Sequence, residues 1–339
     1  MEPSVCVVGA CNMDLVAYVP RMPVIGETLH GTKFQMGFGG KGANQAAQAA
    51  KLGTATTFIG RVGDDVFGHQ FLDNFKKVGI RTDHVGVVSG VSTGVAPINV
   101  DQHGANSIVI VNGANDHLTE NGPSLPPSGN QTDCALVLVV QLEVPLAPTL
   151  AALRLARAHG VVTIVNPAPA REGLPAELLA LADIVSPNEP ETHMLTGCPV
   201  DSEAALRQAT ETLMRQGPPC VVLTLGARGA ALAVGSRFEQ VPVGRTPAKV
   251  VDTTGAGDSF VGSFATLLAH HLLASATPGE QPRATLLRLL SSPHEGWTRL
   301  LACIRGANVC ASMSVEREGT QCSYPTRDQL PAGLFETRL

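Results

Sequence analysis

The sequence of 339 residues predicts a single α/β domain built on a mostly parallel β-sheet. Three observations support this fold class. Short apolar runs rich in β-branched residues recur, segments of helical periodicity separate several of them, and aromatic residues make up only 4% of the composition. Strands that alternate with helices form right-handed βαβ units. The abundant glycine, alanine and valine residues suit helices packed closely on a parallel sheet.

The apolar runs locate the expected strands, and the spacing of apolar residues locates the helices. Phe67, Phe71, Phe75 and Val78 recur at the spacing of one helix face. Similar patterns predict helices over residues 146–159 and 202–216. Strands are expected at residues 5–9, 56–60, 135–140, 161–165, 184–185 and 221–225.

Two regions interrupt this alternation. Residues 14–38 and 92–111 contain short, partly polar strands with no helix between them, so we do not expect them to join the parallel sheet. They can pair with each other as a small β-sheet that projects over the domain as a lid. Residues 270–297 form an unusually long connection, with proline, serine and histidine around a short leucine-rich helix. The whole chain, 1–339, is interpreted as one domain.

The composition argues against several classes of protein. A formal net charge of −5 offers no basic surface, so neither nucleic acid nor membrane is expected as a partner. No stretch approaches the roughly 18 apolar residues of a membrane span, and the first residues lack the basic region of a signal peptide. The eight cysteines are scattered and lack zinc-site spacing, which is typical of reduced thiols. We expect a cytoplasmic location, with the nucleus as a further possible location.

The glycine-rich stretch GFGGKGAN at residues 37–44 has two interpretations. It matches the dinucleotide-binding pattern GxGxxG, but the preceding HGTKFQM is too polar for the buried strand which that site requires. It is not a P-loop, since Gly42 rather than Ser or Thr follows Lys41. Gly39 and Gly40 can instead act as a hinge, with Lys41 and Asn44 donating hydrogen bonds to a polyhydroxy substrate from the start of a helix. A plain tight turn into a helix remains the alternative.

A second glycine-containing turn, at residues 252–260, precedes another expected helix. Gly255, Ala256 and Gly257 allow several backbone N–H groups to converge at the positive end of the helix dipole. Such a cradle can hold the charge of a phosphoryl group during its transfer. Asp258 stands in the first helical turn, where it can accept the proton of an attacking hydroxyl. The alternative is that Asp258 only caps the helix.

Taken together, these motifs resemble those of the PfkB family of carbohydrate kinases, over nearly the whole chain. GFGGKGANQAAQAAKLG with IGRVGDDVFG, and VVDTTGAGDSF, match the two family signatures. QLEVP, NPAPA, SPNEPE and TLGARG stand between them in the expected order. The resemblance implies a three-layer αβα sandwich with a β-sheet lid. It also implies ATP-dependent sugar phosphorylation and a homodimer formed through the lids.

The resemblance also implies specific site residues. Asp258 would be the catalytic base, and Gly255, Ala256 and Gly257 would form the anion hole with it. The sugar would be bound by Asn12, Met13, Asp14, Gly40, Lys41, Gly42, Ala43, Asn44, Glu143 and Asp258. ATP would contact Asn188, Thr224, Leu225, Gly226, Ala227, Arg228, Gly229, Gly257, Asp258 and Asn308. Glu191 would hold Mg²⁺ through water, and a K⁺ activator would lie among Asp252, Thr254, Ser314, Arg317, Gly319 and Ser323.

The expected acceptor is D-ribose, phosphorylated at O5. Asn12-Met13-Asp14, GGKGANQ, QLE and EGTQCSYP resemble the ribose-phosphorylating members of the family most. Small polar sugar contacts also favour a pentose over a nucleoside. The alternatives are a kinase of the same fold for fructose, a ketodeoxy sugar acid or adenosine, and a non-catalytic sugar or nucleotide sensor.

Overall fold

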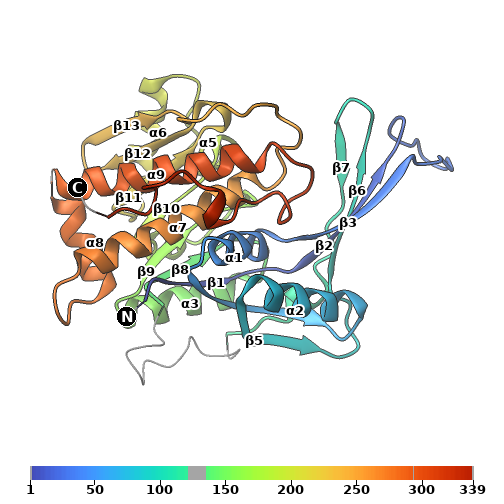
Figure 1. The fold of residues 1–339 in the computed structure, drawn as a ribbon, viewed down its shortest axis with the longest axis horizontal. Helices are drawn as coiled ribbons and strands as arrows, with labels where there is room; N and C mark the ends of the chain where they lie inside the picture. Colours follow the sequence, from blue (N-terminus) through green and yellow to red (C-terminus); the bar gives the residue numbers. More distant parts are fainter. Residues whose placement is uncertain (1, 121–134, 293, 338–339) are drawn as a thin grey trace.

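A nine-stranded sheet forms the centre of the protein in a computed structural model that describes residues 2–120, 135–292 and 294–337 (Figure 1). The seven strands from β11 to β5 are parallel, and the hairpin of β12 and β13 adds two antiparallel strands. The mostly parallel sheet predicted from the sequence is confirmed. In spatial order the strands are β13 (Arg237–Val241), β12 (Ala230–Val234), β11 (Cys220–Thr224), β10 (Ile184–Val185), β9 (Val162–Val165), β8 (Val137–Val140), β1 (Ser4–Val8), β4 (Ala55–Gly63) and β5 (Ile80–Val88).

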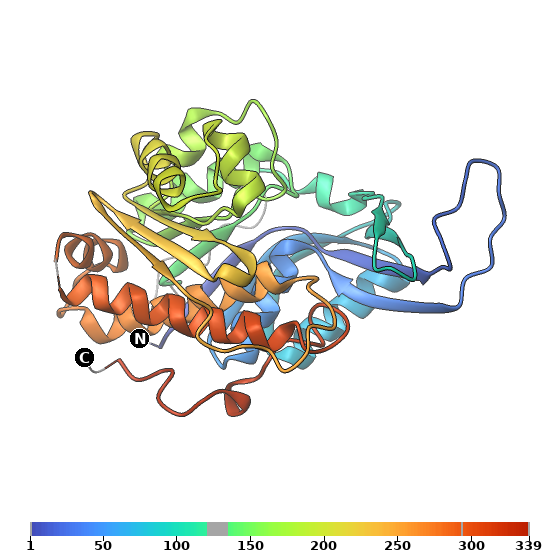
Figure 2. The ribbon, with the colours of Figure 1, turned by 90° about the horizontal axis from the view of Figure 1, so that it is seen from above.

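Helices cover both faces of this sheet, which gives the three-layer αβα sandwich (Figure 2). One face carries α1 (Lys41–Lys51), α2 (Val66–Val78), α7 (Ala256–Ser275), α8 (Pro282–Ser291) and α9 (Glu295–Ser314). The other carries α3 (Leu146–Ala158), α4 (Ala176–Ala180), α5 (Glu189–Thr196) and α6 (Glu203–Arg215). Three short 3₁₀ helices complete the described elements: η1 (Gly113–His117), η2 (Gly226–Arg228) and η3 (Arg327–Gln329).

The central strands are apolar on both faces. In β1, Val5 and Val7 pack into the core below α1 and α7, while Cys6 and Val8 pack into the opposite core with α3. A strand between two helical layers has no face left for polar side chains. This is why the central strands could be recognised as continuous apolar runs.

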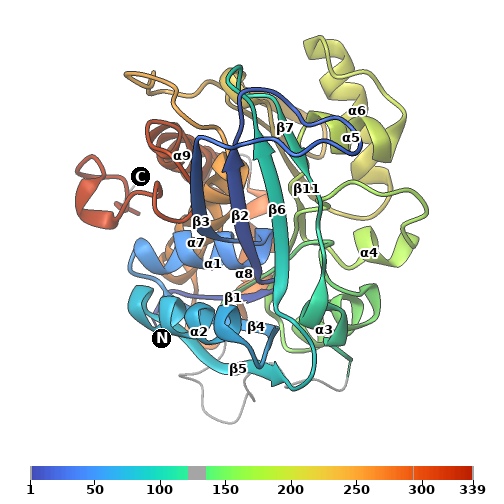
Figure 3. The same cartoon turned by 90° about the vertical axis from the view of Figure 1, so that its right-hand side faces the viewer.

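The predicted lid is confirmed as a separate four-stranded sheet (Figures 1 and 3). Its order is β3 (Lys33–Gly39), β2 (Asn12–Tyr18), β6 (Gly94–Val100) and β7 (Asn106–Ile108), with β2 parallel to β6 and antiparallel to β3. Asn12 and Asp14, both predicted to bind the sugar, belong to β2. They therefore lie where the lid joins the domain.

The long connection at residues 270–297 is folded onto the core. It contains the end of α7, all of α8 and the start of α9, and Leu286 and Leu289 of α8 are buried in the main core. The segment is therefore part of the packed domain. In the described part of the chain, no helix is long and apolar enough to cross a membrane. The seven cysteines described there are free thiols, and Cys134 lies outside the described residues.

Candidate active site

The predicted anion cradle lies at the start of α7. Gly255 adopts a left-handed conformation with φ of 74° and caps the helix, and its carbonyl accepts a hydrogen bond from the Tyr324 hydroxyl at 3.0 Å. The amide of Ala256 donates to the Thr253 carbonyl at 3.2 Å. The amides of Gly257 and Asp258 lack an acceptor among the residues that the structure describes. These two amides are therefore the ones that can bind an anion.

The Asp258 carboxylate is buried and is held by the amides of two neighbouring side chains of α1. Asn44 Nδ2 donates to Oδ2 at 3.0 Å, and Gln45 Nε2 donates to Oδ1 at 3.0 Å. The two glycine-containing motifs, more than 200 residues apart in sequence, are thus joined at one carboxylate. The prediction that Asn44 and Asp258 lie together is consistent with this geometry, whereas sequence reasoning missed Gln45.

The sugar-side residues surround the junction of lid and domain. The backbone amide of Lys41 donates to Glu143 Oε2 at 2.6 Å. Burial raises the pKa of Glu143 to about 7, although nearby Lys41 opposes this shift. Burial, with the charges of Glu143 and Asp258, raises the pKa of Asp14 to about 7 as well. The Asp258 carboxylate raises the pKa of the Lys41 ammonium, which therefore stays charged. Oxygen acceptors and a cation suited to sugar hydroxyls thus lie together.

Asn12 is also held in a fixed orientation. Asn115 of η1 donates from Nδ2 to Asn12 Oδ1 at 2.8 Å and to the Cys11 carbonyl at 3.1 Å. Asn115 Oδ1 in turn accepts a hydrogen bond from the Cys11 backbone amide at 2.9 Å. Because Asn12 Oδ1 is already used as an acceptor, the Nδ2 donor of Asn12 is the group left for a ligand. Three other predicted sugar-binding positions lie in packed surroundings: Met13 and Ala43 are buried in the core, and Gly42 packs against Gly9.

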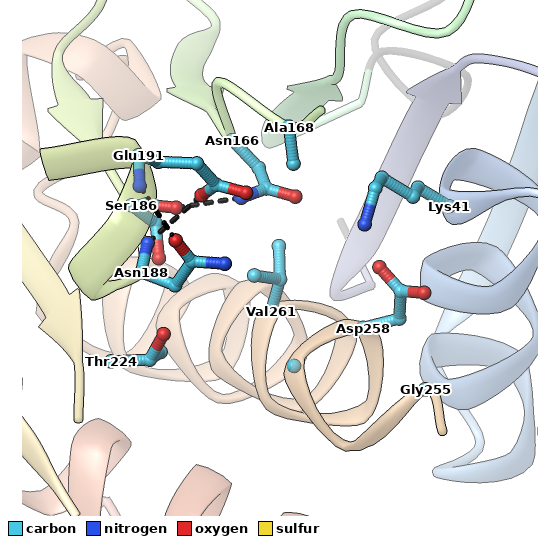
Figure 4. Close-up of a pocket in the computed structure, with 11 residues that line it drawn as sticks. Lys41, Asn166, Ala168, Ser186, Asn188, Glu191, Thr224, Gly255, Asp258 and Val261 are labelled. Atoms are coloured by element: carbon cyan, nitrogen blue, oxygen red, sulfur yellow. Dashed lines mark hydrogen bonds between the residues drawn. The ribbon is translucent and has the colours of Figure 1, made fainter. Parts of the chain in front are cut away.

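A cavity of ≈180 Å³ opens beside the cradle (Figure 4). Lys41 and Asp258 lie on one side, Asn188 and Glu191 on the other, and Val261 of α7 between them. Asn188 and Glu191 form a reciprocal capping box at the start of α5, with both hydrogen bonds at 2.9 Å. Burial raises the pKa of Glu191. The lining residues are Lys41, Asn166, Ala168, Ser186, Asn188, Glu191, Thr224, Gly255, Gly257, Asp258 and Val261.

Sequence reasoning missed four of these lining residues: Asn166, Ala168, Ser186 and Val261. Asn166 follows β9 directly, and its Nδ2 donates to the Ser186 carbonyl at 2.7 Å. A polar residue just after a buried parallel strand is itself a signal, because the carboxyl ends of such strands meet at one edge where ligands bind. Asn166 begins the NPAPA motif and could have been found this way.

The predicted ATP contacts divide into two groups. Asn188, Thr224, Gly257 and Asp258 line the cavity. The remaining positions do not line it: Leu225, Gly226, Ala227, Arg228, Gly229 and Asn308. Arg228 of η2 forms an ion pair with Glu189 and donates to the Val200 carbonyl at 3.1 Å. Asn308 of α9 donates to the Val241 and Pro242 carbonyls at 3.3 and 3.1 Å, so its amide anchors the segment after β13.

The six predicted potassium-site residues lie on the loop before α7 and on the end of α9 with the loop that follows it, and hydrogen bonds join these two segments. Asp252 Oδ1 accepts from the Thr254 amide and Oδ2 from the Gly319 amide, each at 2.9 Å. The amides of residues 251 and 252 both donate to the Val315 carbonyl. The Ser314 hydroxyl donates to the Ala311 carbonyl and the Ser323 hydroxyl to the Thr320 carbonyl, each at 2.8 Å, while Arg317 is exposed.

These features define a class of enzyme. Free amides at a helix start, an adjacent carboxylate and a lysine facing one cavity are suited to phosphoryl transfer onto a hydroxyl group. The family described as pfkB family carbohydrate kinase matches residues 2–327. The chain belongs to this family and is a sugar kinase.

Individual relatives extend over nearly the whole chain. The chain is 40% identical to the ribokinase of Mus musculus over 334 residues, which cover 98% of this chain and 95% of the relative. It is 35% identical to a deoxyribokinase of Salmonella typhi, over 96% of this chain and 97% of the relative. The structure of Arabidopsis thaliana ribokinase complexed with ribose and ATP matches with a TM-score of 0.82 at 31% identity, over 99% of both chains.

Proposed function

We propose that the protein transfers the γ-phosphoryl group of ATP to O5 of D-ribose, giving ribose 5-phosphate and ADP. The observation that carries this proposal is the buried Asp258 carboxylate beside the free amides of the α7 start, between the sugar-side residues and the cavity. The similarity to ribokinases, one of them solved with ribose and ATP, supports ribose as the acceptor.

In the proposed reaction, Asp258 accepts the proton of the ribose 5-hydroxyl as O5 attacks the γ-phosphorus. The new bond joins O5 to phosphorus, and the bond between the γ-phosphorus and the β,γ-bridging oxygen breaks, leaving ADP. The amides of Gly257 and Asp258 stabilise the charge on the phosphoryl oxygens. The Lys41 ammonium, held near the Asp258 carboxylate, adds positive charge on the same side of the cavity. Closure of the lid over the sugar excludes water, so that ATP is not hydrolysed.

Magnesium fits the far side of the cavity. Glu191 and Asn188 line it with carboxylate and amide oxygens, the donors that Mg²⁺ prefers. In residues 2–120, 135–292 and 294–337, no three His, Cys, Asp or Glu side chains gather closely enough to hold a metal alone. Water and phosphate oxygens would therefore complete its coordination, as is common for Mg²⁺. When bound, the ion neutralises charge on the phosphates.

The proposed potassium site is formed by the two segments that Asp252 joins. The Asp252 carboxylate ties the loop before α7 to the amide of Gly319, and the cradle begins soon after, at Gly255. Potassium bound there would stiffen the cradle without touching the substrate. Turnover measured in potassium, sodium and lithium salts tests this idea, and equal rates in all three would contradict it.

Two further properties belong to the proposal. Phe34 and Met36, exposed apolar residues of the lid strand β3, support a homodimer formed through the lids. The free thiols described in the structure support a reducing compartment such as the cytoplasm. Fractionation of cells that express the tagged full-length chain would locate it, and recovery mainly from a secreted fraction would contradict this assignment.

Deoxyribose is the second candidate acceptor, because one relative at 35% identity is a deoxyribokinase. The test is the purified protein with Mg-ATP, potassium and a panel of ribose, deoxyribose, fructose and adenosine. ADP release gives the rate, and ³¹P and ¹³C NMR of the product identify the phosphorylated oxygen. We expect ribose to give the highest kcat/KM and phosphate on O5. Preference for another acceptor would contradict the ribose assignment while leaving the sugar-kinase class intact.

A further inference from the structure

A chain of buried side-chain amides leads to the catalytic carboxylate. Gln45 is 0% exposed, and its Nε2 donates to Asp258 Oδ1 and to Asn166 Oδ1, each at 3.0 Å. Its Oε1 accepts from Gln141 Nε2 at 2.6 Å. These hydrogen bonds thus link the residue that follows β8, the helices α1 and α7, and the residue that follows β9, which are far apart in sequence.

The direction of this hydrogen-bond chain is fixed at one end. The Ser186 carbonyl can only accept, so the Asn166 atom 2.7 Å from it must be the Nδ2 donor. Asn166 then presents Oδ1 to Gln45, which requires a donor from Gln45. The same donor group faces Asp258 Oδ1. The amide orientation of Gln45 therefore follows from a backbone carbonyl and does not depend on the protonation of Asp258.

Asn44 and Gln45 differ in what they can do when sugar binds. Asn44 holds the other oxygen, Oδ2, and its own Oδ1 accepts from Gln321 Nε2 at 3.1 Å. The sequence predicts that Asn44 contacts the sugar, so we infer that its bond to Oδ2 gives way to a sugar hydroxyl. Gln45 has partners on both ends of its amide and no exposed surface, so nothing replaces its bond to Oδ1.

We propose that Gln45 is a positioning residue for the catalytic base. It holds Asp258 Oδ1 throughout the reaction cycle, and this leaves Oδ2 as the atom that takes the proton from the sugar hydroxyl. Asn44 occupies Oδ2 only while the sugar is absent. A single fixed oxygen keeps the carboxylate from rotating, so the free oxygen stays aligned with the hydroxyl. This inference rests on the proposed function of Asp258 as base.

The chain offers a matched control for testing Gln45. Gln48 lies one turn further along α1, is also 0% exposed, and binds Ser259 Oγ at 2.8 Å and the Pro325 carbonyl at 3.2 Å, without contacting Asp258. Gln45→Met and Gln48→Met each remove one buried amide of similar volume. We expect both to lower the melting temperature. Only Gln45→Met should lower kcat, by about 10- to 100-fold, with KM for sugar and ATP within about threefold.

The two variants distinguish a positioning role of Gln45 from a purely structural one. A folded Gln45→Met protein with kcat near that of the natural chain, or equal loss of kcat in both variants, would overturn the proposal. Each variant is compared with the natural chain on whichever sugar that chain phosphorylates best. Failure of the ribose assignment therefore leaves this test intact, and absence of any kinase activity in the natural chain would instead contradict the proposed function.

A second measurement uses the natural chain, so it stands even when Gln45→Met does not fold. A crystal structure with sugar and a non-hydrolysable ATP analogue should keep Gln45 Nε2 at about 3 Å from Asp258 Oδ1. The sugar hydroxyl should lie at Oδ2 in place of Asn44. A complex in which Gln45 has left Oδ1, or in which the hydroxyl contacts Oδ1, would refute the proposal.

Discussion

Two partly buried carboxyl groups near the base, Asp14 and Glu143, should control how the sugar site responds to pH. Their pKa values rise from 3.8 and 4.5 to about 7, chiefly because burial disfavours the charged form. Since the folded protein binds these protons more tightly than the unfolded chain does, the two groups lower its stability as pH rises from about 4 to about 7. Sugar hydroxyls donate to the ionised carboxylates and therefore favour proton loss.

Sugar binding should consequently release protons near neutral pH. Calorimetric titration with ribose in two buffers of different ionisation enthalpy measures this release. At about pH 6.5 we expect different heats in the two buffers and weaker binding than at about pH 8. At about pH 9, where both carboxyls are ionised in the free protein, the heats should converge. Equal heats in both buffers at the lower pH would contradict the assignment of these carboxyls to the sugar.

Gly39 lies so close to Asp14 that an added side chain would displace the Asp14 carboxylate. A Cβ on Gly39 would collide with both carboxylate oxygens of Asp14, whereas a Cβ on Gly37 would lie 3.9 Å from Asp14 Cβ in ordinary contact. Gly39→Ala should displace Asp14 and raise the KM for sugar on the order of 10-fold or more. Gly37→Ala on the same strand is the control and should leave it nearly unchanged. Equal KM values for sugar in the two variants would show that the close contact between Gly39 and Asp14 does not matter for sugar binding.

At the residue scale, the site could be predicted only where the function belongs to a local motif. Lys41, Asn44 and Asp258 stand at helix starts next to glycines, and this position alone suggests ligand contact. Gln45 and Gln48 occur in the same run, ANQAAQAA, and no local pattern tells them apart. Their roles differ because α7 places Asp258 beside one and Ser259 beside the other.

At the scale of elements, the six neighbouring strands from β11 to β4 were predicted, whereas β12 and the two edge strands were not. Central strands are covered on both faces and form continuous apolar runs. The edge strands β5 and β13 carry exposed or half-buried residues, IRTDHVGVV and RFEQV, so they resemble loops in the sequence. Helix ends were placed to within a residue, as at Glu203–Arg215, because Ser202 caps the helix by accepting from the Ala205 amide.

Substitutions in α8 test whether the long connection at residues 270–297 is part of the core. Leu286 is 0% exposed, while its neighbour Leu287 is 37% exposed. Leu286→Ala should lower the free energy of unfolding by about 2–4 kcal/mol, because it leaves a cavity in the core. Leu287→Ala should cost less than about 1 kcal/mol. Denaturant unfolding measures both values.

The same variants report on the nucleotide pocket. Because no residue of α8 lines the cavity, the KM for ATP should stay within about twofold in both. A stability loss as small for Leu286→Ala as for Leu287→Ala would show that the segment packs loosely. A large rise in the KM for ATP would show that it supports the nucleotide site.

At the scale of the whole molecule, the lid presents apolar side chains that a monomer would leave in water. Phe34 and Met36 of β3 are 63% and 50% exposed, and they share one face of the lid with Leu15 of β2, which pairs with Met36. Exposed apolar patches of this kind mark interaction surfaces. A second lid of the same chain is the partner we propose.

Charging this surface should separate the subunits. We expect the natural chain to sediment as a dimer, and Phe34→Glu combined with Met36→Glu to sediment as a monomer with a higher KM for sugar. Val66→Glu is the control, because Val66 is equally exposed, at 63%, but lies on α2 outside the lid. A natural chain that sediments as a monomer at micromolar concentration, or a double variant that stays dimeric, would contradict the lid interface.

The central claim is that Asp258 takes the proton of the sugar hydroxyl beside the amides of the α7 start. Turnover by Asp258→Asn, measured together with sugar binding by calorimetry, tests it most directly. The amide keeps the shape of the side chain but is a far weaker base. We predict a fall in kcat on the order of 10²-fold or more, with sugar affinity changed only modestly. Turnover close to that of the natural chain would contradict the claim.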